Sequence, residues 1–207
     1  MRYKPISIRE LLTELHTIST LIIDLAYSAV LFDDYELAEE VIELEEKGED
    51  LISLLLMNTA LVIRDADDAE AMIGIMRMGS VAEKISKSAG DIARIVLSGL
   101  KVDPYIIEVF NKTQERLVRV KILPNSILSE KSIGKLNLEA NIGIDIIAVR
   151  RGKQLYPKPK HSLILLEGDV LIARGGSVGV LELSKLANGE LRSIPKPKID
   201  EKEMGSK

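Results

Sequence analysis

The 207-residue sequence contains no cysteine and only two histidines. The lack of cysteine excludes a disulfide framework, a thiolate metal site and a cysteine nucleophile, and it fits a reducing cytoplasm. The 28 basic and 32 acidic residues give a net charge of −4 and are scattered along the chain. Because duplex nucleic acid requires a wide basic face, we expect no nucleic-acid partner.

Long hydrophobic runs and catalytic motifs are also missing. The apolar runs are interrupted by Asp, Glu or Lys well before the roughly 18 to 20 residues that cross a bilayer. Residues 1–5 lead into Ser7-Ile-Arg-Glu rather than into the apolar core of a signal peptide. The sequence has no nucleophile elbow, no phosphate-binding loop and no Gly-x-Gly-x-x-Gly after a strand. We therefore expect a soluble, cytoplasmic protein that is not an enzyme and binds no cofactor.

Residues 7 to 100 carry three helical patterns in succession. Each begins with a capping-box pattern, in which a polar side chain caps the first turn and an acid three residues later bonds back. The three pairs are Ser7 with Glu10, Asp33 with Glu36, and Asp67 with Glu70. Apolar or small residues then recur at alternating spacings of three and four, which places them on one stripe of each helix. The stripes are Leu11, Leu15, Ile18, Ile22, Leu25, Ala29 and Phe32; Leu37, Val41, Leu44, Gly48, Leu51, Leu55, Asn58 and Val62; and Met72, Ile75, Gly79, Ala82, Ser86, Ala89, Ala93 and Val96.

These stripes and the short connections between them predict a long antiparallel three-helix bundle. The small side chains of the third stripe allow close helix approach, so we expect this helix to be the most enclosed. The segment Ile75 to Ile85 resembles the third helix of PhoU-type domains of phosphate-transport regulators, with Arg77 and Gly79 in register. Members of that family often carry two such bundles in tandem. The resemblance therefore implies a dimer in which the second bundle comes from another subunit.

Metal-binding members of that family use carboxylates four residues apart, so that both face one cation. In this register the third-helix pair would fall on Met76 and Ser80, neither of which is a ligand for a hard metal. The second helix does carry the pair Glu46 and Asp50, but an acidic run on a helix is usually a solvated face. We therefore expect no metal site, and we interpret the lone His16 as a packed or surface residue.

The remainder of the chain changes to short strands and turns. Asp103-Pro104 opens a helical linker over 101–116 that holds two domains at a fixed angle. Period-two alternation at Val118 to Ile122 and a strong apolar run at 142–151 predict strands. We further expect a short helix from Ser132, strands at 154–156 and 170–174, a final helix at 178–186, and a flexible polar tail at 191–207. The predicted fold is thus α+β in two domains: a bundle over 1–100 and a small α/β domain over 117–190.

The order of elements and turn residues in this second domain closely resembles the TrkA C-terminal domain, also called RCK-C. The matching residues are Ser132 to Leu136, Gly143 to Gly152, Pro157-x-Pro159, Gly168-Asp169-Val-Leu-Ile172 and Gly175. RCK-C domains are the ligand-sensing half of regulators of potassium channels and transporters. They generally pair as dimers, and some relatives bind a small anionic ligand such as a cyclic dinucleotide at the pair interface.

A phosphate pocket requires cationic side chains. Cationic side chains lie at the end of the strand at 142–151 and in the irregular crossing at 157–161. They are Arg150, Arg151, Lys158, Lys160 and His161, which could also be ordinary surface charges. Three interpretations stay open. The first is a homodimeric regulator of cation transport, with potassium as the expected ion, attached to the membrane through a channel or transporter. The second is a PhoU-like phosphate-signalling or metal-binding adaptor, and the third is a dimerisation module without a ligand.

Overall fold

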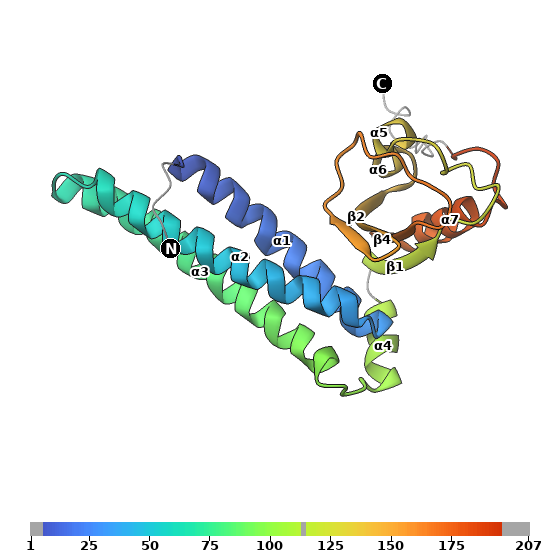
Figure 1. Cartoon of the computed structure of the whole chain (residues 1–207), viewed down its shortest axis with the longest axis horizontal. Helices are drawn as coiled ribbons and strands as arrows, with labels where there is room; N and C mark the ends of the chain where they lie inside the picture. Colours follow the sequence, from blue (N-terminus) through green and yellow to red (C-terminus); the bar gives the residue numbers. More distant parts are fainter. Residues whose placement is uncertain (1–5, 113–114, 196–207) are drawn as a thin grey trace, which may run out of the picture. The chain divides into compact units, whose positions relative to one another are not determined.

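The computed structural model describes residues 6–112 and 115–195. Within it the chain divides into two compact units between Asp103 and Pro104. Three long helices form the first unit, and the second is a small α/β domain built on an antiparallel four-stranded sheet (Figure 1). This is the fold class that the sequence predicts.

The first unit is an antiparallel bundle of α1 (Ile8–Phe32), α2 (Tyr35–Val62) and α3 (Ala66–Leu97), in which each helix packs against the other two (Figure 1). The capping box of α1 is confirmed: the Ser7 hydroxyl accepts from the Glu10 N–H, and the Glu10 carboxylate accepts from the Ser7 N–H. Hydrogen bonds from Ser7 lower the pKa of Glu10.

The two other predicted caps are wrong by one and two residues. Asp33 ends α1 in the left-handed conformation, with φ of 48°, so the N-cap of α2 is Asp34, whose carboxylate accepts from the Leu37 N–H. The N-cap of α3 is Asp65, which accepts from the Asp68 N–H. In each acidic connection several aspartates can cap, and the backbone conformation at the turn decides which one does.

Burial confirms the stripes of α1 and α2 except at their last positions, where Phe32 is half-buried and Val62 is exposed, and it contradicts the expected enclosure of α3. Ten of 25 residues in α1 and twelve of 28 in α2 are buried, against six of 32 in α3. The buried residues of α3 are Gly79, Ser86, Ala89, Gly90, Ala93 and Val96. A three-helix bundle covers each helix on one side only, so small side chains bring α3 close to its neighbours without enclosing it.

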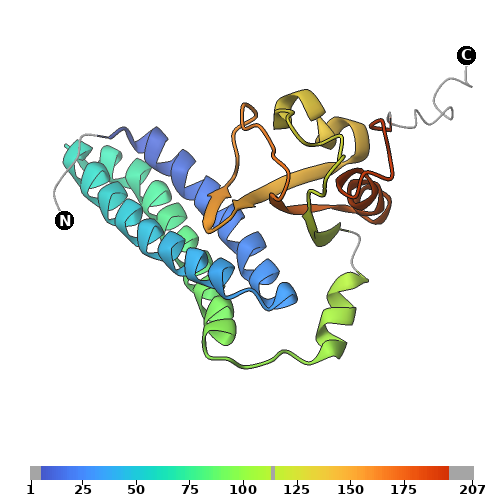
Figure 2. The ribbon, with the colours of Figure 1, turned by 45° about the vertical axis from the view of Figure 1, so that its right-hand side comes forward.

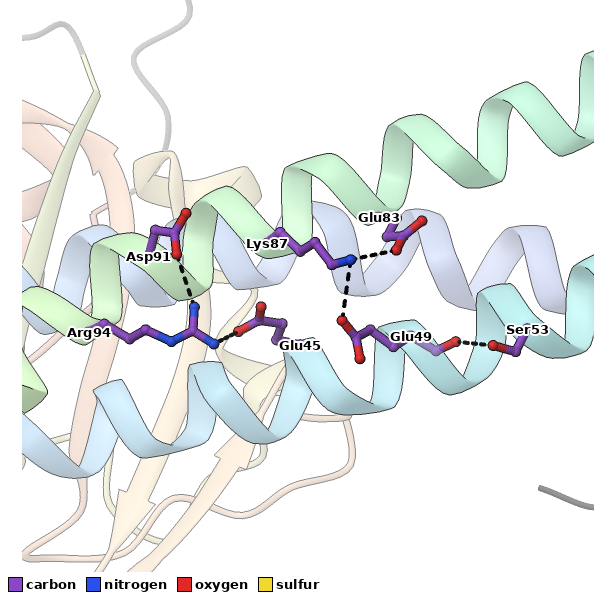
Figure 3. Close-up of polar contacts among 7 residues, drawn as sticks. All are labelled: Glu45, Glu49, Ser53, Glu83, Lys87, Asp91 and Arg94. Atoms are coloured by element: carbon purple, nitrogen blue, oxygen red, sulfur yellow. Dashed lines mark hydrogen bonds and ion pairs between the residues drawn. The ribbon is translucent and has the colours of Figure 1, made fainter.

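Close approach and ion pairs join α2 to α3. A Cβ at Gly79 would lie 2.9 Å from Leu55 Cδ2, and a Cβ at Gly90 would overlap the Glu45 carboxylate. Figure 3 shows the polar contacts along this seam: Arg94 pairs with Glu45 at 2.8 Å, and Lys87 bridges Glu83 and Glu49. Glycine at 90 therefore makes the space that Glu45 occupies.

Helix α1 also has the length and composition of a membrane-crossing segment, with a mean hydropathy of 1.6 over 18 residues. Counting unbroken apolar runs misses this property, because Asp24 interrupts a stretch whose average is strongly apolar. The expectation that no segment reaches this length and hydropathy is therefore wrong for α1. Half of this 18-residue stretch is buried in the structure, where Leu15, Ile22 and Leu25 lie in the bundle core. The core helix of a soluble protein can have the same length and hydropathy.

The second unit begins with α4 (Pro104–Asn111), and its sheet has the order β1 (Glu115–Lys121), β4 (Val170–Gly176), β2 (Ile144–Arg151), β3 (Gln154–Pro157), with every pairing antiparallel. The helices are α5 (Ile133–Leu136), α6 (Leu138–Ile142) and α7 (Ser177–Ala187). Helix α7 packs on β1 and β4, α6 packs on β2, and the two helices touch each other (Figure 2). Between them lies a core that includes Leu128, Leu136, Ile144, Leu171, Leu183 and Leu186.

The predicted strands and the final helix are present, and one helix was missed. Asn137, in the left-handed conformation with φ of 44°, ends α5 and starts α6 at once, so the expected short helix is two short helices. Gly175 lies against Gly143 O and Ile144 Cδ1, where a Cβ would overlap both. The predicted linker helix corresponds to α4, which ends at Asn111; residues 113 and 114 of that linker and residues 196–207 of the tail lie outside the described residues.

Candidate ligand site

An arginine–aspartate pair organises the end of the sheet in the second unit. Strand β2 ends at Arg151, and Gly152, with φ of 58°, turns the chain into β3. Arg151 Nε donates to Asp169 Oδ1 at 2.8 Å and Nη2 donates to Oδ2 at 2.8 Å. Nη2 also donates to the carbonyl oxygen of Ile164 at 2.7 Å. One guanidinium therefore joins β2, the segment before the turn at Gly168, and the start of β4.

The burial of Asp169 explains why its pair with Arg151 is bidentate. Asp169 is 1% exposed, and its Oδ2 also accepts from the Leu166 N–H at 2.8 Å. A buried carboxylate is tolerated when charged and backbone donors satisfy it. The hydrogen bonds to Asp169 raise the pKa of Arg151, whose guanidinium also lies 5.8 Å from the centre of the Tyr156 ring. The pair is thus a fixed structural element beside the crossing from β3 to β4.

A cavity opens next to this pair, and it is the larger of the two that are described below for the second unit. Its volume is about 740 Å³, within the range of small-molecule sites. Its wall is mostly apolar, and cationic side chains are placed along it. The lining residues are Arg151, Leu155, Tyr156, Pro157, Lys158, Pro159, Lys160, Ser162, Leu163, Ile164 and Leu166.

A second cavity of about 170 Å³ shares Lys158 and Pro159 with the first. It is also lined by His161 and by two carboxylates, Glu139 and Asp145. These acids oppose the charge of an anion, whereas the lining of the larger cavity contains no acid. The larger cavity is therefore the better site for a phosphate-bearing ligand.

Backbone contacts hold the crossing between the two cavities. Lys158 has φ of 45°, and its N–H donates to the carbonyl oxygen of Ile147 at 2.8 Å. The N–H of Gly134 donates to the carbonyl oxygen of His161 at 2.8 Å, where a Cβ at residue 134 would lie 3.1 Å from that oxygen. The lysines are thus presented from a segment tied at both ends to the domain.

The five residues predicted from the sequence fall in three places. Arg151, Lys158 and Lys160 line the larger cavity, while Lys158 and His161 line the smaller one. Arg150 lines neither, because side chains alternate along a strand and its neighbour Arg151 takes the cavity side. Two nitrogens of Arg151 are already bonded to Asp169.

Sequence reasoning missed the residues that give the site its walls and frame. Tyr156 and Ile164 were not singled out, and Asp169 was named only as one of the residues that match RCK-C domains, not as a partner of Arg151. Asp169 could have been found from its pattern, because an acid just before a buried strand requires a cationic partner. Asp145 is exposed, and its carboxylate lies 3.6 Å from Arg174 Nη2.

The carboxylates of the first unit are placed differently. Glu46 and Asp50 are exposed on α2, and Glu45, the buried acid beside them, pairs with Arg94. Among residues 6–112 and 115–195, no three His, Asp or Glu side chains gather as a metal site would require.

Comparison with known proteins identifies the second unit. Residues 117–188 match the family model of the TrkA-C domain. The chain is 25% identical over 104 residues to the Ktr system potassium uptake protein C of Bacillus subtilis, an alignment that covers 50% of this chain and 46% of that protein. It therefore spans about half of the length of this relative.

Solved structures were also found. The RCK C domain of the potassium transport protein KtrA, in complex with cyclic diadenosine monophosphate, is 28% identical and covers 40% of this chain and 92% of its own, with a TM-score of 0.33. The S. agalactiae BusR protein in complex with promoter DNA is 13% identical and covers 83% of this chain and 96% of its own, with a TM-score of 0.34. Residues 117–188 of this chain thus match the TrkA-C (RCK-C) domain, and the chain is similar to a Ktr potassium uptake protein.

Proposed function

We propose that this protein is a non-enzymatic regulatory subunit of cation transport, with potassium as the ion, and that its TrkA-C domain senses a small anionic ligand of the cyclic-dinucleotide class. The TrkA-C match and the potassium uptake relative support the transport role. The observation that carries the ligand role is the 740 Å³ cavity beside the Arg151–Asp169 pair.

The lining of this cavity has the two kinds of group that a cyclic dinucleotide requires. Tyr156, Pro157 and Leu155 present flat and apolar surface for bases, which stack on such side chains. Lys158 and Lys160 are exposed on the same wall and provide positive charge for phosphates. Arg151 frames the wall because Asp169 holds it, while His161 and Arg150 lie outside this cavity.

The same proposal includes a cytoplasmic homodimer that pairs through its TrkA-C domains and attaches to a membrane channel or transporter. The pairing follows from the resemblance to RCK-C domains. A ligand bound near a pairing surface can shift an equilibrium between two arrangements only through its different affinity for them. The ligand would in this way favour one arrangement of the paired TrkA-C domains, and the transporter would respond to that arrangement.

Isothermal titration calorimetry on the full chain tests the ligand. We expect cyclic diadenosine monophosphate to bind, and Lys160→Gln to weaken binding by about ten- to a hundredfold, since one charge-assisted hydrogen bond is worth about 1.5–3 kcal/mol. Lys153→Gln is the matched control, because Lys153 is exposed in the β2–β3 turn and does not line the cavity. No heat with this ligand, cyclic diguanosine monophosphate or ATP refutes the ligand role, and equal effects of both variants refute the site.

A pull-down from membranes of the native organism tests the transport role. The tagged protein is expected to co-purify with a membrane cation channel or transporter. Recovery without any such protein, from membranes in which potassium transporters are detected, contradicts this part of the proposal.

The PhoU-like nature of the bundle is a separate part of the proposal. It rests on the segment Ile75 to Ile85, with Arg77 and Gly79 in register. The alternative of a metal-binding adaptor is less well supported, because Glu46 and Asp50 are exposed and Glu45 is paired with Arg94. Elemental analysis of the purified protein decides between them: a transition metal that is lost on Glu46→Ala with Asp50→Ala would favour the adaptor.

A further inference from the structure

Helix α3 carries a second stripe at heptad spacing, one residue away from the stripe that faces the bundle. Its members recur every three or four residues over most of the helix. They are Ala71, Gly74, Met78, Val81, Ile85, Ser88, Ile92 and Ile95. Met78 is 63% exposed, Val81 55% and Ile95 39%. A helix that is apolar on two adjacent faces is usually covered on both, and the bundle covers only one.

This stripe forms one wall of a groove between α3 and α1. Two cavities of about 360 and 300 Å³ lie along it and share Val81 and Ile85. Their lining residues come only from α1 and α3, and α1 contributes Leu12, Leu15, His16, Ser19, Ile23 and Tyr27. The groove is thus long enough, and its lining apolar enough, for one more helix to pack in it.

We propose that this groove is covered by α3 of a second copy of the chain, packed antiparallel about a twofold axis. A twofold interface places the same surface on both partners, so the surface must complement itself. Whether the surface complements itself depends on the charged residues that flank the stripe. They repeat every seven residues and are Glu70, Arg77, Lys84 and Asp91.

In an antiparallel pair of helices, equivalent flanking positions of the two copies meet. Placing Arg77 opposite Asp91 of the second copy produces two symmetric ion pairs and brings the two Lys84 residues together at the axis, so this register has two attractive pairs against one like-charge contact. Asp91 already accepts from Arg94 Nη1 at 3.1 Å, but its side chain is 79% exposed and can accept a second cation. Sliding the helices by seven residues in one direction sets Arg77 against Lys84 and Glu70 against Asp91, and these like charges repel.

The same register also matches the sizes of the apolar side chains. Met78 then faces Ser88, Ile92 faces Gly74, and Ile95 faces Ala71, each large residue meeting a small one. At the centre Val81 faces Ile85. Sliding by seven residues in the other direction pairs Lys84 with Asp91, but it sets Met78 against Ile95 and Val81 against Ile92. Alternation of large and small side chains allows interdigitated packing, so the first register is favoured.

The PhoU-type resemblance implies a dimer that supplies a second bundle, and this interface adds the helix face, the direction and the register; it does not depend on the proposed ligand role. It concerns the bundle, whereas the ligand role concerns the TrkA-C domain. Loss of ligand binding and loss of this contact are therefore separate results, the first seen by calorimetry and the second by cross-linking.

Cross-linking through one introduced cysteine tests the proposal, because the natural chain has none. In the full chain, Lys84→Cys is expected to give a covalent dimer with a short bis-maleimide, since the two copies of this residue meet at the axis. Lys87→Cys is the matched control: it lies on the same helix, but Lys87 faces Glu49 of α2. Pairing through TrkA-C domains alone would not distinguish the two positions, so equal or absent cross-linking overturns the proposal.

Charge reversal in the Lys84→Cys background tests the register. Arg77→Glu and Asp91→Arg, each alone, are expected to slow cross-linking by about fivefold or more, because each creates two like-charge pairs. The two changes together restore the charge pattern and should recover most of the rate. Circular dichroism confirms that each variant is folded. Single variants that cross-link at the unmodified rate, or a double variant as slow as either, overturn this register.

Discussion

Glu45 of α2 and Arg94 of α3 meet at 2.8 Å across the bundle, in a space that exists because residue 90 has no side chain. Glu45 is 7% exposed, and Arg94 also reaches Asp91 at 3.1 Å. Figure 3 shows the guanidinium between the two acids. A buried carboxylate is costly without its cation, so the pair and the glycine act together.

Gly90→Ala is therefore expected to destabilise the protein, although alanine has the higher helix propensity. The new methyl group would displace the Glu45 carboxylate from Arg94, at a cost of about 1–3 kcal/mol. Urea unfolding followed by circular dichroism measures the change. Ser80→Ala, at an exposed position of the same helix, is the control and should not destabilise. A Gly90→Ala protein as stable as the parent would contradict the described packing.

Asp169→Asn is expected to destabilise the second unit by about 2–4 kcal/mol. The change removes the charge that holds Arg151 and leaves a buried amide in its place. Arg151→Lys should also destabilise, because an ammonium cannot form the two parallel bonds. Arg150→Lys is the matched control on the neighbouring residue. Urea unfolding measures all three, and a larger loss in the control than in Asp169→Asn would refute the role of the pair.

Two adjacent glycines should respond differently to alanine. A Cβ at Gly175 would overlap Gly143 O and Ile144 Cδ1, whereas a Cβ at Gly176 meets nothing within 4 Å. Gly175→Ala is expected to cost about 1–3 kcal/mol and Gly176→Ala less than about 1 kcal/mol. Thermal unfolding of the two variants checks the order, and a reversed order would show that the strand is held differently.

Glu40 predicts a pH-dependent stability. Burial, and then repulsion from Glu43, raise the pKa of Glu40 above its usual 4.5. The folded state therefore binds the proton more tightly than the unfolded state. Stability is lost as the pH rises from the pKa of Glu40 in the unfolded state through its higher pKa in the folded state. Glu40→Gln should stabilise the protein at pH 7 by less than about 1 kcal/mol and have little effect below about pH 4.

Urea midpoints at the two pH values measure this difference. Glu39→Gln, one residue away and exposed, controls for the loss of one negative charge. A gain at pH 4 as large as the gain at pH 7 would assign the effect to packing rather than to ionisation.

Local patterns predicted most of the elements. Periods of three and four placed α1 and α2 with their buried faces, and period-two alternation with turn residues placed the strands. Where several neighbours could serve, as at Asp33 and Asp34 or at Asp65 and Asp67, the pattern chose the wrong one. Cap choice depends on one backbone dihedral, which a pattern of residue types does not specify.

The candidate site was harder to predict because its parts come from distant segments. Lys158 and Lys160 were found by their charge, but the Arg151–Asp169 pair joins residues 18 apart that meet only after β4 lies beside β2. The walls contributed by Tyr156 and Ile164 likewise exist only once the crossing is folded over the sheet.

The sequence alone determined the two-part architecture, the TrkA-C resemblance and the cationic crossing, because hydrophobic period and turn chemistry are local properties of the chain. Tertiary structure decided that α3 is the least buried of the three bundle helices, that Asp169 holds Arg151, and that only part of the cationic cluster lines the larger cavity. These outcomes depend on which surfaces of separate segments meet. Such contacts are set by packing and by the pairing of buried charges rather than by the neighbours of a residue in the chain.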